Sequence, residues 1–199
     1  MKKVLVLILV LFSFQSIAQN NGFGFRLGDL SGLTYKKYMG SKALEISLGR
    51  THVFYGNHWY NERFEGWYKD KKYYYDDMHY IAFDKGVGAL GLQVHYLLFQ
   101  KPINGTSSST GSLDWYFGIG GQINFHSYRY VYEYKVNGLW YQSRDRVTNI
   151  DLGADGVIGL EYKFSQPFSI FIDATLFMEI FDDPFLPWGQ GGIGARYNF

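Results

Sequence analysis

Residues 113–125 read LDWYFGIGGQINF, a stretch in which apolar side chains return at every second position. The apolar set occupies odd positions: Leu113, Trp115, Phe117, Ile119, Ile123 and Phe125. Small or polar residues occupy even positions: Asp114, Gly118, Gly120, Gln122 and Asn124. A period of two is typical of a β-strand, because successive side chains point to opposite sides. The stretch therefore predicts a strand with one apolar face and one polar face.

The same alternation marks seven further segments. They span residues 23–28, 33–39, 43–51, 86–98, 152–164, 168–180 and 190–199. The composition agrees, since 20% of the residues are aromatic and there are 24 Gly but only 4 Pro. Aromatic residues favour pleated surfaces, and glycine weakens helices. The expected fold is all-β, a single domain of eight antiparallel strands.

Two turns predict how strands pair. Asn137-Gly138 is a type I′ hairpin signal, and the register it sets places Asn124 opposite Asp151. Polar positions then face polar positions along the whole hairpin, as antiparallel pairing requires. A tight turn at residues 40–41 likewise pairs polar positions with polar positions.

The N-terminus has the pattern of a secretory signal peptide. Two lysines precede an apolar run at 4–14, and Ser16-Ile17-Ala18 offers small residues at a cleavage site. The run is too short for a transmembrane helix, which needs about 20 apolar residues. We predict a signal peptide at residues 1–18 and a barrel domain at residues 19–199.

The lengths of the connections predict a membrane barrel. Long excursions at 53–85, 127–148 and 181–188 lie at the end of the strands opposite to the tight turns at 40–41 and 165–167. An even strand number, apolar faces about ten residues long and long loops at one end are typical of an eight-stranded transmembrane β-barrel of the outer membrane. Both termini then lie with the short turns, on the periplasmic side.

A soluble barrel with an inward apolar face, as in lipocalins, is the alternative all-β fold. Three features favour the membrane barrel: the polar face is rich in glycine, as a cramped interior requires; the last strand ends on Phe199; and there are 0 Cys to staple the fold. The absence of Cys also excludes thiolate metal sites and thiol catalysis.

The signal peptide, the eight strands and the terminal Tyr197-Asn198-Phe199 resemble small bacterial outer-membrane barrels of the OmpA and OmpX type, most closely the barrel-only proteins of Bacteroidetes. The resemblance implies the outer membrane of a Gram-negative bacterium, with extracellular loops and periplasmic termini. It also implies contact with outer-membrane lipid, lipopolysaccharide and the outer-membrane assembly machinery. The assembly signal would fall on Phe199 and Tyr197.

The predicted inward face carries both acids and bases. An eight-stranded barrel is just wide enough for side chains to fill, so these charges are expected to pair with one another. The predicted lumen network comprises Arg26, Lys36, Glu45, Asp114, Asp155, Glu161, Asp173 and Arg196. A narrow path for ions or protons is the alternative.

Aromatic residues gather outside the predicted membrane band. The 53–85 excursion holds twelve aromatics, and tyrosines alternate after Phe125, where outward positions become polar. We expect the hairpin to continue beyond the membrane as a two-stranded ribbon with a tyrosine face. Such surfaces suit binding of protein or glycan, although the rings would also pack on one another to order a long loop. The candidate interaction residues are Trp59, Tyr60, Trp67, Tyr68, Tyr128, Tyr130, Tyr132 and Tyr134.

The expected function is a structural or surface-interaction role without catalysis. A narrow channel is the second hypothesis, and an enzyme acting on lipid is the third. His126 and Ser127 are neighbours on a strand, so they point to opposite faces and cannot form a catalytic pair.

No spacing supports a metal site at His58, His79, Asp76 and Asp77, and no cofactor is expected. Nucleic acid is excluded as a partner, because the net charge is +1 and no polybasic run occurs.

Overall fold

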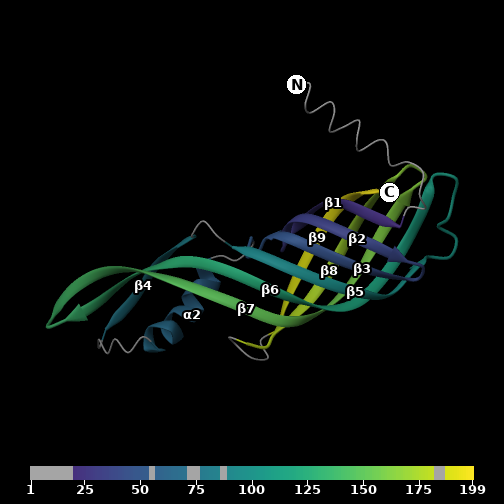
Figure 1. Ribbon diagram of the computed structural model, residues 1–199. Helices are drawn as coiled ribbons and strands as arrows, with labels where there is room; N and C mark the ends of the chain where they lie inside the picture. The colour runs from purple at the N-terminus through teal and green to yellow at the C-terminus, as the bar shows by residue number, and fades with distance from the viewer. Residues whose placement is uncertain (1–19, 54–56, 71–76, 86–88, 182–186) are drawn as a thin grey trace, which may run out of the picture.

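The computed structural model describes residues 20–53, 57–70, 77–85, 89–181 and 187–199. The predicted signal peptide and Asp76 lie outside these ranges. Eight strands form a closed antiparallel ring (Figure 1). They are β1 (Asn21–Gly28), β2 (Ser31–Met39), β3 (Lys42–Arg50), β5 (Leu90–Pro102), β6 (Gly111–Val136), β7 (Leu139–Phe164), β8 (Phe168–Glu179) and β9 (Pro187–Asn198). Strand β9 pairs with β1 from Gly22↔Asn198 to Gly28↔Gly192 and closes the barrel. The predicted eight-stranded barrel is confirmed.

Both predicted hairpin registers are confirmed. Asn124 lies opposite Asp151 in the β6–β7 pair, and Lys36 lies opposite Glu45 in the β2–β3 pair. At the β6–β7 turn, Asn137 and Gly138 have φ angles of 51° and 84°. Two consecutive positive φ angles define the type I′ turn, whose twist matches that of the flanking strands.

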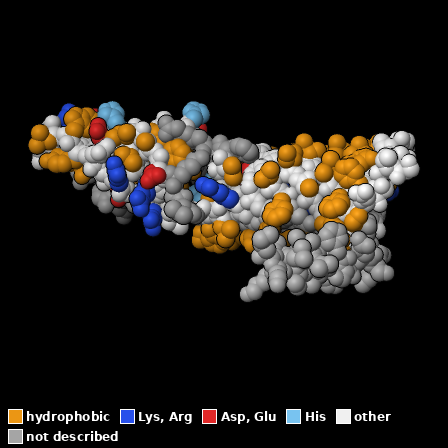
Figure 2. Space-filling view, turned by 90° about the horizontal axis from the view of Figure 1, so that it is seen from above, with side chains coloured by type: hydrophobic (Ala, Val, Ile, Leu, Met, Phe, Trp, Pro, Cys, Tyr) orange, Lys and Arg blue, Asp and Glu red, His pale blue; other side chains and the backbone are white. Residues whose placement is uncertain are grey.

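The barrel is apolar outside and polar inside. Outward side chains such as Ile158, Ile172 and Ile193 are more than half exposed (57%, 54% and 55%), whereas Arg26 and Arg196 inside the ring are each 1% exposed. Figure 2 shows hydrophobic side chains gathered over the barrel, while most of the Lys, Arg, Asp and Glu side chains visible on this face lie over the extension beyond it. A water-soluble barrel would place its apolar face inward, so this arrangement excludes the lipocalin alternative and requires lipid around the wall.

The segment predicted as a loop at 53–85 contains a helix and a ninth strand. Helix α2 (Asn57–Asp70) and strand β4 (Met78–Lys85) both lie outside the ring. In the described part of the chain, no helix is long and apolar enough to cross a membrane. Strand β6 has two successive partners on the same edge. It pairs with β5 up to Phe125 and with β4 from Tyr128 onward.

The predicted ribbon is confirmed and is larger than expected. Strands β6 and β7 remain paired without interruption from Gly111↔Phe164 to Val136↔Leu139, and β4 adds a third strand. Figure 1 shows this extension projecting from one end of the barrel with α2 beside it, while the C-terminus lies at the other end. We call α2, β4 and residues 126–149 the head.

Candidate functional site

Four buried charges from four strands form the centre of the lumen. Lys36 Nζ lies 2.8 Å from Glu161 Oε2 and 3.8 Å from Glu45 Oε2. Arg196 contacts the same two acids, at 2.8 Å from Glu45 and 3.2 Å from Glu161. Two cations thus meet two anions in a closed square, so that no member of this set is buried without an opposite charge.

Three further pairs, each an acid with a base or an imidazole, lie inside the barrel along its strands. Arg26 meets Asp173 at 2.6 Å, Lys163 meets Asp114 at 2.8 Å, and His95 Nε2 lies 3.2 Å from Asp155 Oδ1. The structure therefore places all eight predicted lumen residues inside the ring and gives each a partner of opposite charge or an imidazole.

Aromatic side chains fill the space that the charges leave. The Lys36 ammonium lies 4.3 Å from the centre of the Tyr116 ring, and the Arg196 guanidinium lies 3.6 Å from the centre of the Phe171 ring. Gly194 makes room for that phenyl ring, since a Cβ at this position would lie 2.4 Å from Phe171 Cζ. The interior is a packed polar core, as the width of an eight-stranded barrel dictates.

The predicted tyrosine face exists, but it is buried. Tyr128, Tyr130 and Tyr132 of β6 are each 3% exposed or less, because Tyr60, Phe64 and Tyr68 of α2 cover them. The Phe64 ring centre lies 5.2 Å from that of Tyr130, and the Tyr130 hydroxyl donates to the Tyr60 carbonyl at 3.0 Å. The prediction that Tyr60, Tyr68, Tyr128, Tyr130 and Tyr132 form a contact surface is therefore wrong, because these rings are the core of the head. Trp67 and Tyr134 pack at the edge of this core, and the Trp59 side chain lies outside the described ones.

Among the described side chains of the head, the exposed aromatic ones lie instead at the hairpin tip. Leu139, Trp140 and Tyr141 are 63%, 45% and 46% exposed. The Trp140 ring stacks on His79 with centres 5.1 Å apart, and Lys135 Nζ lies 5.6 Å from the same ring. Tyr141 lies on the other face of the hairpin, where its ring stacks on Tyr134 with centres 5.9 Å apart. The tip thus presents an exposed aromatic side chain on each face, at the end of the hairpin farthest from the barrel.

The predicted assembly signal lies at the seam that closes the barrel. The Phe199 backbone exchanges two hydrogen bonds with Asn21, at 2.8 and 3.0 Å. Tyr197 lies two residues earlier on β9, opposite Phe23 of β1 and Phe168 of β8. Tyr197 thus belongs to the last strand of the ring, and Phe199 directly follows that strand.

One cluster near the base of the head was not predicted from the sequence. His52, His126 and Asp151 bring three ligand atoms within 4.8 Å of one another. Burial lowers the pKa of His52 to about 3; the charges of His126 and Arg63 add to this effect, and Asp151 opposes it. The β6–β7 register alone places His126 and Asp151 on the same face, one diagonal step apart. This register is the feature of the sequence that could have indicated their contact.

Among the described residues, those considered for metal or catalysis from the sequence do not assemble. His58 lies on the exposed side of α2 beside Glu62, and His79 stacks on Trp140. His126 is buried inside, whereas the Ser127 hydroxyl accepts a hydrogen bond from Thr148 on the other face, so the two do not form a pair.

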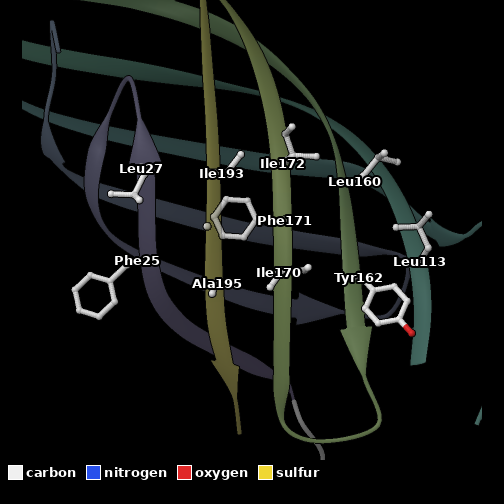
Figure 3. Close-up of a pocket in the computed structure, with 11 residues that line it drawn as sticks. Phe25, Leu27, Leu113, Leu160, Tyr162, Ile170, Phe171, Ile172, Ile193 and Ala195 are labelled. Carbon is white, nitrogen blue, oxygen red and sulfur yellow. The ribbon is translucent and has the colours of Figure 1, made fainter. Parts of the chain in front are cut away.

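The barrel wall carries a shallow apolar depression of about 640 Å³ (Figure 3). Outward residues of five strands line it, among them Phe25, Ile172, Ile193 and Leu160. Its lining contains no carboxylate, imidazole or amine, and Tyr162 supplies the one side-chain hydroxyl. The depression has the chemistry of a surface in contact with acyl chains and offers no nucleophile with a base.

Comparisons with known proteins add a structural likeness. No family model matches the chain, and no curated protein matches its sequence. Among solved structures, the chain is similar to the N-terminal β-barrel domain of Pseudomonas aeruginosa OprF, with 15% identity over 90% of this chain and 94% of that chain and a TM-score of 0.44. The closed ring of eight antiparallel strands, seen in this chain's own pairing, is the architecture that the resemblance to OmpA and OmpX barrels implied.

Proposed function

We propose that this protein resides in the outer membrane of a Gram-negative bacterium, where it is non-enzymatic and carries a folded head on the extracellular side. The observation that carries the proposal is the contrast between its two parts. The barrel has an apolar wall and a lumen filled by paired charges, whereas the head is a covered, ordered unit built on strands that continue out of the wall. Such a molecule suits anchoring and display better than transport.

The polarity of the wall supports a head that stands outside the membrane. Along β6 the outward positions change from Ile119, Ile123 and Phe125 to Arg129 and Glu133. A charged side chain facing the middle of the bilayer costs about 2–4 kcal/mol for Arg or Lys, so the head is expected outside the hydrocarbon. The termini then lie in the periplasm, where the barrel assembly machinery would meet Tyr197 and Phe199.

The interaction role falls on the hairpin tip. Trp140 and Tyr141 are exposed, and aromatic side chains supply large contact areas at low entropic cost. We propose this tip as the contact for a surface protein or glycan, in place of the buried tyrosine face. Lipopolysaccharide and outer-membrane lipid are the expected neighbours of the wall.

Planar-bilayer recording tests the non-transport part of the proposal. The purified protein, reconstituted beside a general porin as positive control, is expected to give no persistent openings. Ion-selective openings would favour the narrow-channel hypothesis instead.

Arrays of glycans and matrix proteins test the surface role. Nanodisc-embedded protein is compared with a Trp140→Ser/Tyr141→Ser variant and with the exposed Glu62→Ala of α2 as a control. We expect binding that the tip variant loses and the control keeps. Equal binding by all three proteins would assign the contact to another surface.

A further inference from the structure

Three residues that are distant in sequence converge where the head joins the barrel. His52 follows β3, His126 lies on β6 and Asp151 lies on β7. The three side chains are 5%, 3% and 2% exposed. Asp151 Oδ2 lies 3.5 Å from His52 Nε2 and 3.3 Å from His126 Nδ1, so one carboxylate oxygen faces two imidazole nitrogens.

Two of the three distances between ligand atoms match the edges of a small tetrahedral coordination shell. With bonds of about 2.0–2.1 Å, two ligands of a tetrahedral zinc ion lie about 3.3–3.4 Å apart. Both measured edges fall close to this value, and the third pair of ligand atoms lies within 4.8 Å. Two imidazoles and one carboxylate are also a ligand set that zinc accepts when a water completes the shell.

Rigid elements hold the three ligands. His126 and Asp151 are fixed by the β6–β7 ladder, and the His126 ring stacks on Tyr128 at 5.6 Å with an angle of 11° between the planes. The backbone N–H of His52 donates to Asp29 Oδ1 at 2.8 Å, and the Thr51 hydroxyl donates to the same oxygen at 3.1 Å. Ligands supported in this way lose little freedom when an ion binds.

We propose that His52 Nε2, His126 Nδ1 and Asp151 Oδ2 bind one divalent cation of the zinc type. The ion joins the segment after β3 to the β6–β7 hairpin at the base of the head, and it acts there as a structural staple. The proposal is independent of the surface role, because it depends only on the fold and on these three side chains.

Calorimetric titration with Zn²⁺ tests the site directly. The full chain is folded in detergent micelles, stripped with a chelator and titrated with Zn²⁺, and then with Co²⁺, whose tetrahedral complexes absorb strongly in the visible range. We expect one equivalent per chain and the tetrahedral cobalt spectrum. A folded chain that binds no Zn²⁺ would overturn the proposal.

Variants separate this site from the surface histidines. His52→Gln and Asp151→Asn are each expected to lose the bound equivalent and the cobalt spectrum, whereas His58→Gln/His79→Gln keeps both. His52 lies outside the strands, so His52→Gln remains informative if Asp151→Asn fails to fold. Binding that survives His52→Gln but disappears in the His58→Gln/His79→Gln variant would overturn the assignment.

A change in nearby charge gives an independent readout. The positive charge of Arg63 acts on His52 and would oppose a bound cation. We expect Arg63→Gln to tighten Zn²⁺ binding by about three- to tenfold. Unchanged affinity in Arg63→Gln would place the ion elsewhere.

Discussion

Arg26 of β1 and Asp173 of β8 form a 2.6 Å ion pair although strand β9 runs between their strands. Gly192 of β9 makes this reach possible, since a Cβ there would lie 2.5 Å from Arg26 Cζ. The Arg26 guanidinium also donates to the Leu30 carbonyl at 2.7 Å. A glycine in the wall thus lets one side chain of β1 contact β8 and the β1–β2 connection inside the lumen.

Removal of this acid tests the lumen network. Asp173→Asn leaves the Arg26 guanidinium buried without its counter-charge, and we expect a loss of about 3–5 kcal/mol in the free energy of unfolding. Reversible urea unfolding in micelles measures this loss. Asp70→Asn, at the exposed end of α2, serves as the control and should stay within about 0.5 kcal/mol. An Arg26→Met/Asp173→Leu variant should recover most of the loss, because it removes both charges together.

The lumen glycines are predicted to be intolerant of side chains. Gly194→Ala would bring a Cβ to 2.3 Å from the Phe25 carbonyl and 2.4 Å from Phe171, so we expect a loss of about 1–3 kcal/mol or more. Gly189→Ala in the same strand meets nothing within 4 Å and should be nearly neutral. Equal unfolding curves for the two variants would mean that the lumen is not packed as described.

The head is predicted to open without the barrel. Phe64 is 4% exposed and packs against the rings of Tyr130 and Tyr132, so Phe64→Ala should weaken the docking of α2 by about 3–5 kcal/mol. Limited proteolysis should then cut within 57–70, while the barrel strands stay protected. Glu65→Ala on the exposed side of α2 should leave the helix protected. Simultaneous unfolding of head and barrel in Phe64→Ala would show that the two are one cooperative unit.

High pH should detach the head as its tyrosines ionise. Burial, followed by the effect of neighbouring Tyr130, raises the pKa of Tyr60 and of Tyr80 to about 12, from an ordinary value of 10.0. Because the folded head favours the neutral phenols, their contribution is complete below pH 10 and disappears as the pH rises towards 12. Absorbance at the phenolate band, followed together with protease protection of 57–70, should report both changes over that interval. Ionisation of all tyrosines with a midpoint near pH 10 would contradict the buried core of the head.

The sequence predicted the barrel because its determinants are local. The alternation at 113–125 and the Asn137-Gly138 turn specify strand faces and register without reference to distant residues. Helix α2 was missed although Tyr60, Phe64, Trp67 and Tyr68 recur at helical spacing, because aromatic residues have low helix propensity. The burial of Tyr130 depends on the docking of that helix, a tertiary event that alternation in β6 alone does not report.

The cluster of His52, His126 and Asp151 also depends partly on local sequence and partly on tertiary contacts. His126 and Asp151 follow from the β6–β7 register, and so does the face that they share. His52 follows β3, and its position depends on the contact between Thr51 and Asp29, which joins two separate connections of the barrel. Nothing in the spacing of His52 from the other two residues indicates that they meet.

The position of the membrane along β6 tests the account most directly. The chain has 0 Cys, so single cysteines can be labelled with an environment-sensitive probe in lipid vesicles. We predict hydrocarbon surroundings and quenching by labelled lipid at the outward positions Phe117, Ile119, Ile123 and Phe125. Labels at the outward positions Ser127, Arg129 and Val131 should report water or the membrane interface. Hydrocarbon surroundings at Val131, or an aqueous signal at Ile119, would contradict a barrel whose wall ends at Phe125 and continues as a head outside the membrane.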